Sequence, residues 1–325
     1  MQADERTGAD AEGSAADRLP DDPVLSVENL VVSYASAAGR RRAVDDLTFE
    51  VRRAETYGLV GESGSGKSST AFAILGLIKP PGQIEGGRIR LEGTDLVGLT
   101  REAWRPIRWR RISLVPQGAM NALNPVMRVG EQIGDAIEAH DGRQDAAGLR
   151  ERIVALLESV GLTERVVRAY PHELSGGMKQ RACIAMAIAL EPALIIADEP
   201  TSALDVVVQR AVAETLMEVK QRIGASVILI GHDLGLQAQM VDRLGVMYRG
   251  RLVETGPSRE LFHHPQHPYT ELLVHSVPSI RGGGDDTLTG AARRARELAA
   301  AADELAKTGI PTLRLVGPDH WAALP

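Results

Sequence analysis

The feature that most constrains the fold is the stretch 61–68, which reads GESGSGKS. It matches G-x-x-x-x-G-K-[ST], follows the short apolar run 57–60 and precedes residues 68–78, which have helical character. Its glycines let backbone N–H groups turn inward around phosphate oxygens, and the start of the following helix adds a positive potential. The sequence therefore predicts an α/β fold in which a strand, a phosphate-binding loop and a helix follow one another.

Two side chains of this loop are expected to have specific roles. Lys67 would reach the β- and γ-phosphates of a nucleotide, and the Ser68 hydroxyl would ligate Mg²⁺. The alternative, a chance glycine-rich turn, does not explain the strand before it and the helix after it. The residues predicted to bind the nucleotide here are Gly61, Glu62, Ser63, Gly64, Ser65, Gly66, Lys67, Ser68 and Ser69.

An acidic strand end is predicted at residues 194–199, which read LIIADE. Asp198 is placed to hold Mg²⁺ through water, and Glu199 is placed to polarise the attacking water as a general base. A solvated strand end would rarely follow four apolar residues. Two adjacent carboxylates beside a bound cation favour hydrolysis over simple nucleotide binding.

Three further side chains become candidates because each lies at the end of a predicted strand. Gln117 ends the strand 112–116, where it could contact Mg²⁺ and the attacking water. His232 follows the strand 226–230, where an imidazole can stabilise the γ-phosphate or orient water. Tyr34 ends the first strand, where its ring could stack on adenine. Taken singly, each of the three also fits a purely structural role.

A second anion site is predicted at residues 174–178, which read LSGGM and open a helix before the acidic strand end. The Ser175 side chain and the amides of Gly176 and Gly177 would lie at the positive end of that helix. Such a segment is far rarer in nucleotide hydrolases than a phosphate loop.

The remaining sequence suggests how the chain is organised. Residues 1–23 predict a disordered acidic tail, with seven acidic residues against two arginines. Residues 24–34 alternate in the manner of an edge strand, 35–42 predict a basic turn, and 43–51 predict another strand. From 118 to about 170 the pattern is helical, with apolar residues at three- and four-residue spacing in 129–140 and 149–160.

Towards the C-terminus, 246–248 and 251–254 predict a hairpin that closes the core. The glycines at 282–284 predict a hinge. Beyond it a heptad-like stripe predicts a helix that either packs on its own domain or forms a dimer contact. The residues of this stripe are Leu288, Ala291, Ala295, Leu298, Ala302 and Leu305.

Composition excludes several classes of protein. The net charge of −6 gives no global preference for nucleic acid or an anionic membrane. The single cysteine, Cys183, rules out an intrachain disulfide and an all-cysteine metal site. No signal peptide is visible, and the longest apolar run, 182–190, is far shorter than the ~20 residues that span a bilayer. Any link to a membrane is therefore expected to pass through a partner protein.

Seven segments together resemble the motifs of ABC ATPases and occur in the same order. This resemblance implies an α/β fold with a P-loop NTPase core of the ABC type, an antiparallel β subdomain and an inserted helical subdomain at about 118–172. It further implies an ATPase domain over 24–280 and a C-terminal extension over 281–325. The segments that carry it are Tyr34, 61–68, Gln117, 174–178, Asp198-Glu199, 202–205 and His232.

A narrower resemblance links residues 118–125, 170–178 and 267–270 to the oligopeptide/dipeptide (and nickel) importer subfamily. Met178 and the run 197–201 are similar to its first ATPase subunit. This resemblance implies ATP and Mg²⁺ as cofactors and a head-to-tail pairing with a second ATPase, expected to be a different chain. It also implies two transmembrane permeases, an extracellular solute-binding protein acting indirectly, and a peripheral location on the cytoplasmic face of the membrane.

One departure from the subfamily bears on cofactors. Many relatives carry a cysteine-rich segment after the His-Pro-Tyr-Thr stretch, associated with an iron–sulfur cluster. The corresponding region here has no cysteine, so no cluster is expected and the role of 281–325 stays open. The resemblance leaves oligopeptides, dipeptides and nickel open as the solute, because ATPase subunits of this subfamily do not touch it.

The motifs are also compatible with other functions. A soluble ABC ATPase of DNA repair or translation is the main alternative, although 67–175 leaves room for no long coiled coil and the chain has one cassette. An exporter ATPase is disfavoured by 118–125 and 267–270. A metal site at His263, His264 and His267 conflicts with the neighbouring prolines. Nucleic-acid binding is not expected, because the arginines of 101–111 fit a solvated helix face better.

Overall fold

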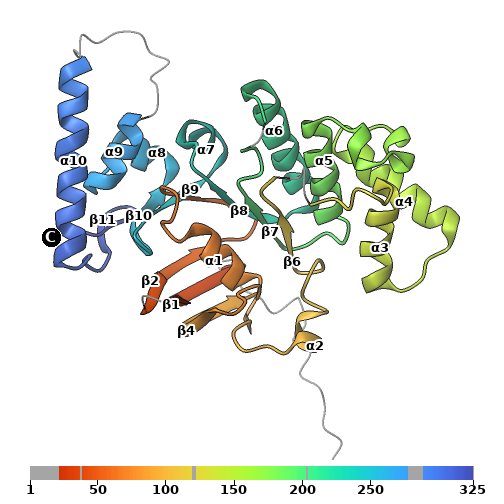
Figure 1. The fold of residues 1–325 in the computed structure, drawn as a ribbon, viewed down its shortest axis with the longest axis horizontal. Coiled ribbons are helices and arrows are strands. Elements are labelled where there is room, and N and C mark those ends of the chain that lie inside the picture. The colour runs from red at the N-terminus through yellow and green to blue at the C-terminus, as the bar shows by residue number, and fades with distance from the viewer. Residues whose placement is uncertain (1–21, 37–38, 119–121, 203, 277–287, 325) are drawn as a thin grey trace, which may run out of the picture.

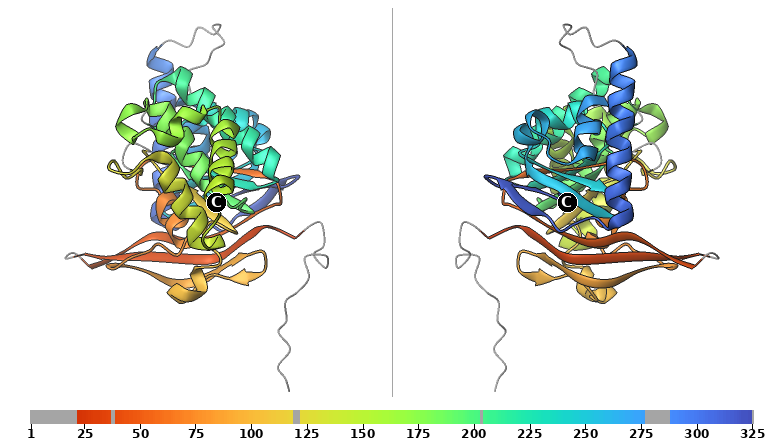
Figure 2. Two further views of the ribbon diagram at one scale, coloured as in Figure 1. Left: turned by 90° about the vertical axis from the view of Figure 1, so that its right-hand side faces the viewer. Right: turned by 90° about the vertical axis from the view of Figure 1, so that its left-hand side faces the viewer.

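The computed structural model describes residues 22–36, 39–118, 122–202, 204–276 and 288–324 of the 325-residue chain. Most of the predicted acidic tail and all of the predicted hinge at 282–284 lie outside these residues, as does part of 118–125. Two sheets and the helices around them make up the described structure (Figure 1). Figure 2 shows the four-stranded sheet as a layer of its own beneath the rest of the molecule.

The four-stranded sheet is antiparallel, with strands in the order β2-β1-β4-β5. The prediction of an edge strand at 24–34 is wrong, because β1 pairs with β2 on one side and with β4 on the other. The alternation in β1 instead reflects a sheet with one buried face, on which Leu25 and Val27 are fully buried. The predicted basic turn is also too long, since β2 already begins at Gly39. The strands are β1 (Leu25–Ser36), β2 (Gly39–Val51), β4 (Gly82–Leu91) and β5 (Thr94–Asp95).

The eight-stranded sheet has the order β11-β12-β10-β9-β3-β8-β7-β6. Strands β9, β3, β8, β7 and β6 are parallel, and β3 and β7 are buried along their whole length. Because parallel strands end at the same edge of a sheet, the residues after β3, β6, β7 and β8 are brought together. The strands are β3 (Thr56–Val60), β6 (Ile112–Val115), β7 (Leu194–Asp198), β8 (Ser226–Gly231), β9 (Arg243–Tyr248), β10 (Arg251–Pro257), β11 (Arg314–Gly317) and β12 (His320–Ala322).

Helices cover this sheet and form the insertion that the sequence predicts. Helix α1 ends at Ile74, four residues earlier than expected, because Gly76 adopts a φ of 62° and packs under the Trp104 ring. The insertion consists of α3 (Val129–Asp141), α4 (Ala146–Ser159) and the 3-10 helices η2 (Glu164–Arg168) and η3 (Pro171–Glu173). The other helices are α1 (Lys67–Ile74), α2 (Arg101–Trp104), α5 (Gly176–Ala187), α6 (Val206–Ile223), α7 (Leu234–Met240), α8 (Ser258–His263), α9 (Pro268–Ser276) and α10 (Leu288–Thr308).

The C-terminal segment from α10 to β12 packs on the rest of the structure at the end opposite the helical insertion (Figure 1). Helix α10 lies along α9, and Leu298 and Ala302 of its apolar stripe are buried, so the stripe is used at least in part within its own chain. The predicted hairpin is confirmed as β9 and β10, but it does not close the sheet. Strand β12 pairs with β10, and β11 pairs with β12.

Candidate nucleotide site

The segment 61–68 follows β3 and runs into α1, whose first two residues are Lys67 and Ser68, as expected from its sequence. Gly61 and Gly66 have φ angles of 147° and 108°. A Cβ atom on Gly61 would lie 2.2 Å from the Met247 carbonyl oxygen, and one on Gly66 would lie 2.4 Å from the Ala43 carbonyl oxygen. Both the backbone conformation and the close neighbours therefore require glycine, which holds the loop tightly between β9 and β2.

Lys67 is only 5% exposed, and its ammonium group is held by the loop itself. Its Nζ atom donates to the carbonyl oxygens of Gly61, at 2.6 Å, and Glu62, at 2.9 Å. Burial lowers the pKa of Lys67, against the opposing effect of the nearby Glu199 and Asp198 carboxylates. The loop thus holds a cation with little solvation, to which a phosphate group would be strongly attracted.

The end of β7 provides two carboxylates with different surroundings. Asp198 is 3% exposed, and burial together with the Glu199 charge raises its pKa. Its Oδ1 atom lies 3.5 Å from the Ser68 hydroxyl. A hydroxyl and a buried carboxylate next to a phosphate loop are oxygen donors that suit Mg²⁺, which typically takes one or two carboxylates and completes its shell with phosphates and water.

Glu199 turns sharply out of the strand, with a φ of 43° that is unusual for a residue other than glycine. Its amide is fixed by donating to the Ile230 carbonyl at 2.9 Å. The carboxylate then lies between two predicted partners: Gln117 Nε2 donates to Oε2 at 2.8 Å, and His232 Nδ1 lies 3.5 Å from Oε1. The ends of β6, β7 and β8 therefore bring Gln117, Glu199 and His232 together.

These side chains open onto one cavity of about 1480 Å³. Loop residues 62–69 line it together with Tyr34, Gln117, Glu199 and His232, whereas Gly61 and Asp198 are not among the lining residues. Tyr34 borders the loop, because its hydroxyl accepts from Ser69 Oγ at 3.5 Å. The residues that the sequence predicted to bind the nucleotide or to activate water, apart from those of 174–178, are thus neighbours in space.

The segment 174–178 lies apart from this cavity. Ser175 caps helix α5, where its Oγ accepts from the Met178 amide at 3.3 Å, and Gly176 and Gly177 form the first turn. A Cβ atom on Gly177 would lie 2.6 Å from Val208 Cγ1, so α6 packs closely against this turn. None of these three residues lines the cavity described above.

Motif reasoning missed a second wall of the cavity, which comes partly from the C-terminal region. Tyr248 and Arg249 both contact Asp303 of α10, the latter at 2.7 Å. Tyr269 lies in the His-Pro-Tyr-Thr stretch of the narrower resemblance, and no sequence motif assigned the other lining residues to the site. The additional lining residues include Arg41, Arg42, Tyr248, Arg249, Tyr269 and Asp303.

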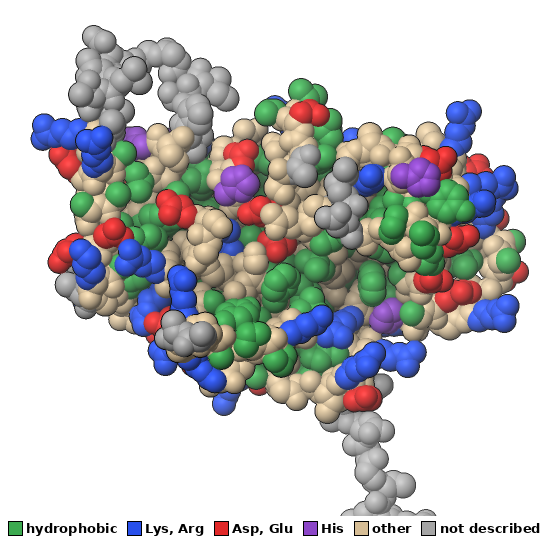
Figure 3. Space-filling view, in the orientation of Figure 1, with side chains coloured by type: hydrophobic (Ala, Val, Ile, Leu, Met, Phe, Trp, Pro, Cys, Tyr) green, Lys and Arg blue, Asp and Glu red, His purple; other side chains and the backbone are tan. Residues whose placement is uncertain are grey.

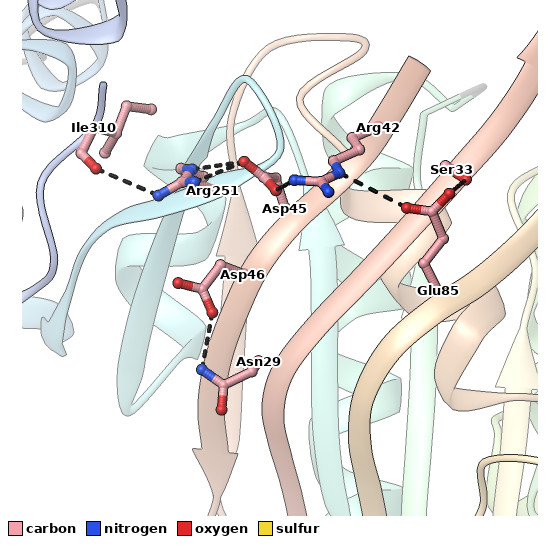
Figure 4. Close-up of polar contacts among 8 residues, drawn as sticks. All are labelled: Asn29, Ser33, Arg42, Asp45, Asp46, Glu85, Arg251 and Ile310. Carbon is pink, nitrogen blue, oxygen red and sulfur yellow. Dashed lines mark hydrogen bonds and ion pairs between the residues drawn. The ribbon is translucent and has the colours of Figure 1, made fainter. Parts of the chain in front are cut away.

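A chain of polar contacts ties this wall to the antiparallel sheet (Figure 4). Asp45 accepts from Arg42 at 2.8 Å and from Arg251 at 2.7 Å, and Arg251 also donates to the Ile310 carbonyl at 3.4 Å. Partial burial disfavours the Asp45 charge, but the two guanidinium groups outweigh it and lower the pKa of Asp45. The segment after α10 is thereby linked through β10 to β2, beside the cavity.

The other candidates have structural explanations. Burial lowers the pKa of His267 to about 4, and the described residues contain no group of three His, Cys, Asp or Glu side chains placed to hold a metal. Arg108 stacks on Trp104, while Arg110 and Arg111 pair with Asp141 and Glu92. The expected helix ends at Trp104, so these three arginines do not lie on a helix face, although Arg110 is exposed to solvent. On the face drawn in Figure 3, acidic and basic side chains are interspersed.

Comparisons with known proteins identify the family. Residues 44–202 match the family model described as "ABC transporter", and residues 253–303 match "Oligopeptide/dipeptide transporter, C-terminal region". The chain is 44% identical over 269 residues to the oligopeptide transport ATP-binding protein OppD of Bacillus subtilis, which covers 82% of this chain and 75% of that protein. It is also 44% identical over 260 residues to the dipeptide transport ATP-binding protein DppD of the same organism, covering 79% and 77%.

Solved structures agree with this relationship. A dimeric, post-hydrolysis state of the ATP-binding cassette MJ0796 bound to ADP and phosphate superposes with a TM-score of 0.65 at 26% identity, covering 72% of this chain and 99% of that one. Among the described residues, none of the helices has the length and apolar character needed to cross a membrane. The chain belongs to the ATP-hydrolysing, ATP-binding subunits of ABC transporters, in the branch of the oligopeptide and dipeptide transport proteins.

Proposed function

We propose that this chain powers the import of peptides or similar small solutes by hydrolysing ATP at the cytoplasmic face of the membrane. The observation that carries the hydrolytic part is the Glu199 carboxylate, held between Gln117 and His232 at the cavity that the phosphate loop lines. Peptides are proposed as the solute class because the similar proteins are named for oligopeptide and dipeptide transport.

The proposed chemistry assigns one task to each side chain. Glu199 takes a proton from the attacking water, while Gln117 and His232 orient that water and the γ-phosphate. Lys67 binds the β- and γ-phosphates, exchanging its contacts with loop carbonyls for contacts with phosphate oxygens. The Tyr34 ring stacks on adenine at the edge of the cavity.

Ser68 and Asp198 would hold Mg²⁺, with Gln117 as a further contact. When bound, Mg²⁺ neutralises charge on the β- and γ-phosphate oxygens. Support for these ligands comes from the 3.5 Å separation of the Ser68 and Asp198 oxygens. Burial, and after it the Glu199 charge, raises the pKa of Asp198, and a neighbouring cation would stabilise the ionised carboxylate.

The proposed site is completed by a second ATPase chain, expected to differ from this one. Ser175 and the amides of Gly176 and Gly177 would close over ATP held by the partner, and the partner's equivalent segment would close over ATP held here. This arrangement is supported by the position of 174–178 outside the chain's own cavity. Residues 202–205 would lie at the seam between the two chains, although Ala203 is outside the described residues.

The helical insertion is proposed to transmit closure of the ATPase pair to the membrane. Helices α3 and α4 would receive a short cytoplasmic helix from a permease, and Gln117 precedes this insertion in the chain. An extracellular solute-binding protein would deliver the solute without contacting this chain. Binding of ATP between two ATPase chains then favours one conformation of the permeases and hydrolysis releases it.

The hydrolytic assignment is tested with Glu199→Gln, which keeps the contact geometry and removes the base. With the partner ATPase and ATP, this variant is expected to accumulate as a stable dimer with little turnover, measured by sedimentation and phosphate release. Glu158→Gln, an exposed position on α4, is the control and should hydrolyse ATP normally. Unchanged hydrolysis in Glu199→Gln would remove Glu199 from the role of base.

The transport assignment is tested by purifying the tagged, full-length chain from membranes. Recovery of two permeases and a second ATPase is expected. Recovery of ribosomes or DNA instead would favour a soluble, non-transport ABC ATPase and overturn the proposal.

A further inference from the structure

Tyr269, in the His-Pro-Tyr-Thr stretch, contacts the phosphate loop from outside the seven segments that resemble ABC ATPase motifs. It is the second residue of helix α9 and is 1% exposed. Its hydroxyl accepts a hydrogen bond from the Glu62 amide at 2.8 Å. The Glu62 carbonyl in turn accepts from the Lys67 ammonium at 2.9 Å. The backbone of one loop residue is thus bonded on one side to Tyr269 and on the other to Lys67.

The position of Tyr269 is itself fixed by a buried polar network. The carboxylate of Glu254, which is fully buried, accepts from the amides of Gln266 and His267 at 2.9 and 2.8 Å and contacts His320 Nε2 at 2.7 Å. The His267 Nδ1 atom then accepts from the Tyr269 amide at 3.1 Å. These bonds hold the start of α9 against β10 and β12.

The Tyr269 ring is also packed against a second aromatic side chain. Its centroid lies 4.3 Å from that of Tyr248, and the Tyr248 hydroxyl donates to Asp303 of α10. The ring and the backbone of Tyr269 are therefore immobilised from two directions. A rigid acceptor fixes the amide it binds at a lower entropic cost than a mobile one.

We propose that Tyr269 is a positioning residue for nucleotide binding, which holds Glu62, and through it Lys67, in the arrangement that receives the phosphates. The inference rests on the proposed role of the loop 61–68 as the nucleotide site. It gives the His-Pro-Tyr-Thr stretch a task within that site: the stretch presents one hydroxyl group to the phosphate loop. It also ties the shape of the loop to the docking of the C-terminal region.

A packing role and a positioning role for Tyr269 predict different results for Tyr269→Phe. This variant keeps the ring on Tyr248 and removes only the acceptor for the Glu62 amide. Tyr57→Phe is the matched control, because Tyr57 is also fully buried and its hydroxyl forms one hydrogen bond, to Thr255 Oγ1 at 2.9 Å, outside the cavity. The two variants lose the same chemical group from equally buried sites.

The experiment measures ADP binding to the full-length chain by calorimetry, and KM for ATP with kcat for the complete ATPase. Tyr269→Phe is expected to weaken ADP binding and raise KM about fivefold, the value of one ordinary hydrogen bond, with kcat changed less than about twofold. Tyr57→Phe is expected to bind ADP like the unaltered chain. Both should lower the thermal midpoint of the nucleotide-free protein to a similar extent.

Equal ADP affinity in the two variants would overturn the inference and leave Tyr269 as a packing residue. Lys67→Ala, measured in parallel, separates this failure from a failure of the proposed site. If Lys67→Ala also binds ADP normally, the loop 61–68 is not the nucleotide site. If Lys67→Ala loses binding while Tyr269→Phe does not, only the positioning role is refuted.

Discussion

Helices α1 and α5 both begin beside segments rich in glycine and serine, yet their N-termini are built differently. At α1, Gly66 adopts a φ of 108° without a side-chain cap, and the following Lys67 is buried. At α5, the exposed Ser175 accepts a hydrogen bond from the Met178 amide and so caps its own helix. The first N-terminus turns inward over a cavity, and the second is available at the surface.

This difference divides the functions of the site between two places. The start of α1 shares its cavity with Gln117, Glu199 and His232, so the proposed phosphate-binding loop and the groups proposed to activate water face the same space. The start of α5 contributes a hydroxyl and backbone amides, and it lies outside that cavity. We therefore expect that nucleotide binding and closure of the site can be impaired separately by substitutions at the two N-termini.

The largest effect is expected at the start of α1. Lys67→Ala should weaken ADP binding about 100-fold, since it removes charge-assisted hydrogen bonds to phosphate. Calorimetry on the full-length chain measures this, and Lys79→Ala, an exposed lysine beyond α1, is the control. Comparable losses in both variants would mean that general charge, rather than the loop, attracts the nucleotide.

A substitution at the start of α5 should impair hydrolysis and leave nucleotide binding unchanged. Gly177→Ala adds a Cβ atom 2.6 Å from Val208 Cγ1, which should shift the first turn of the helix. ATP hydrolysis by the assembled pair is expected to fall roughly tenfold or more, because small displacements of groups that contact the reacting phosphate are costly. ADP binding to the isolated chain should stay within about twofold.

Gly148→Ala tests whether any added methyl group in a first helical turn has this effect. Its Cβ atom would make only an ordinary 3.6 Å contact with Asp145, so hydrolysis should be unchanged. If Gly177→Ala weakens ADP binding as strongly as hydrolysis, the two N-termini do not act separately.

The sequence predicted the residues at the start of α1 and at the strand ends beside it better than the rest of the cavity wall. The loop 61–68 and the strand ends at Gln117, Glu199 and His232 could be predicted because each is a local pattern and parallel strands align their ends. The contacts of Asp303 with Tyr248 and Arg249 could not, because they join residues about 55 positions apart without a motif at either end. The alternation of β1 marks a buried face but carries no information on which edges are paired, so its central position was missed.

The buried network that fixes Tyr269 beneath the phosphate loop contains His267. This histidine should make the free energy of unfolding depend on pH, an effect not expected from the segment 174–178. His267 titrates near 6.5 when unfolded and at about 4 in the fold, because burial disfavours its charged form. Between these values the unfolded chain binds more protons than the folded chain, so stability is lost as pH falls through this window. Lowering the pH from 7 to 5 should therefore cost about 2 kcal/mol of unfolding free energy from this group.

His267→Asn should remove that contribution, since its amide oxygen can still accept from the Tyr269 amide without titrating. Denaturant unfolding at pH 7 and pH 5 measures the difference between the variant and the unaltered chain. His263→Asn, an exposed histidine on α8, is the control and should keep the original pH response. An identical response in His267→Asn would show that this buried imidazole is not what makes the fold acid-sensitive.

The smallest effect is expected from removing the cap at the start of α5. Ser175→Ala should destabilise the chain by about 1 kcal/mol, because the Met178 amide loses its acceptor. Asp145→Ala, which removes the acceptor of the Gly148 amide at the start of α4, should cost about the same. Both are measured by denaturant unfolding, and both leave ADP binding at the distant α1 loop unchanged. Only Ser175→Ala should also slow hydrolysis by the assembled pair, since only this hydroxyl is proposed to meet the partner's ATP. If the two variants hydrolyse ATP equally well, Ser175 serves as a helix cap alone, and the amides of Gly176 and Gly177 remain as the whole contribution of this N-terminus.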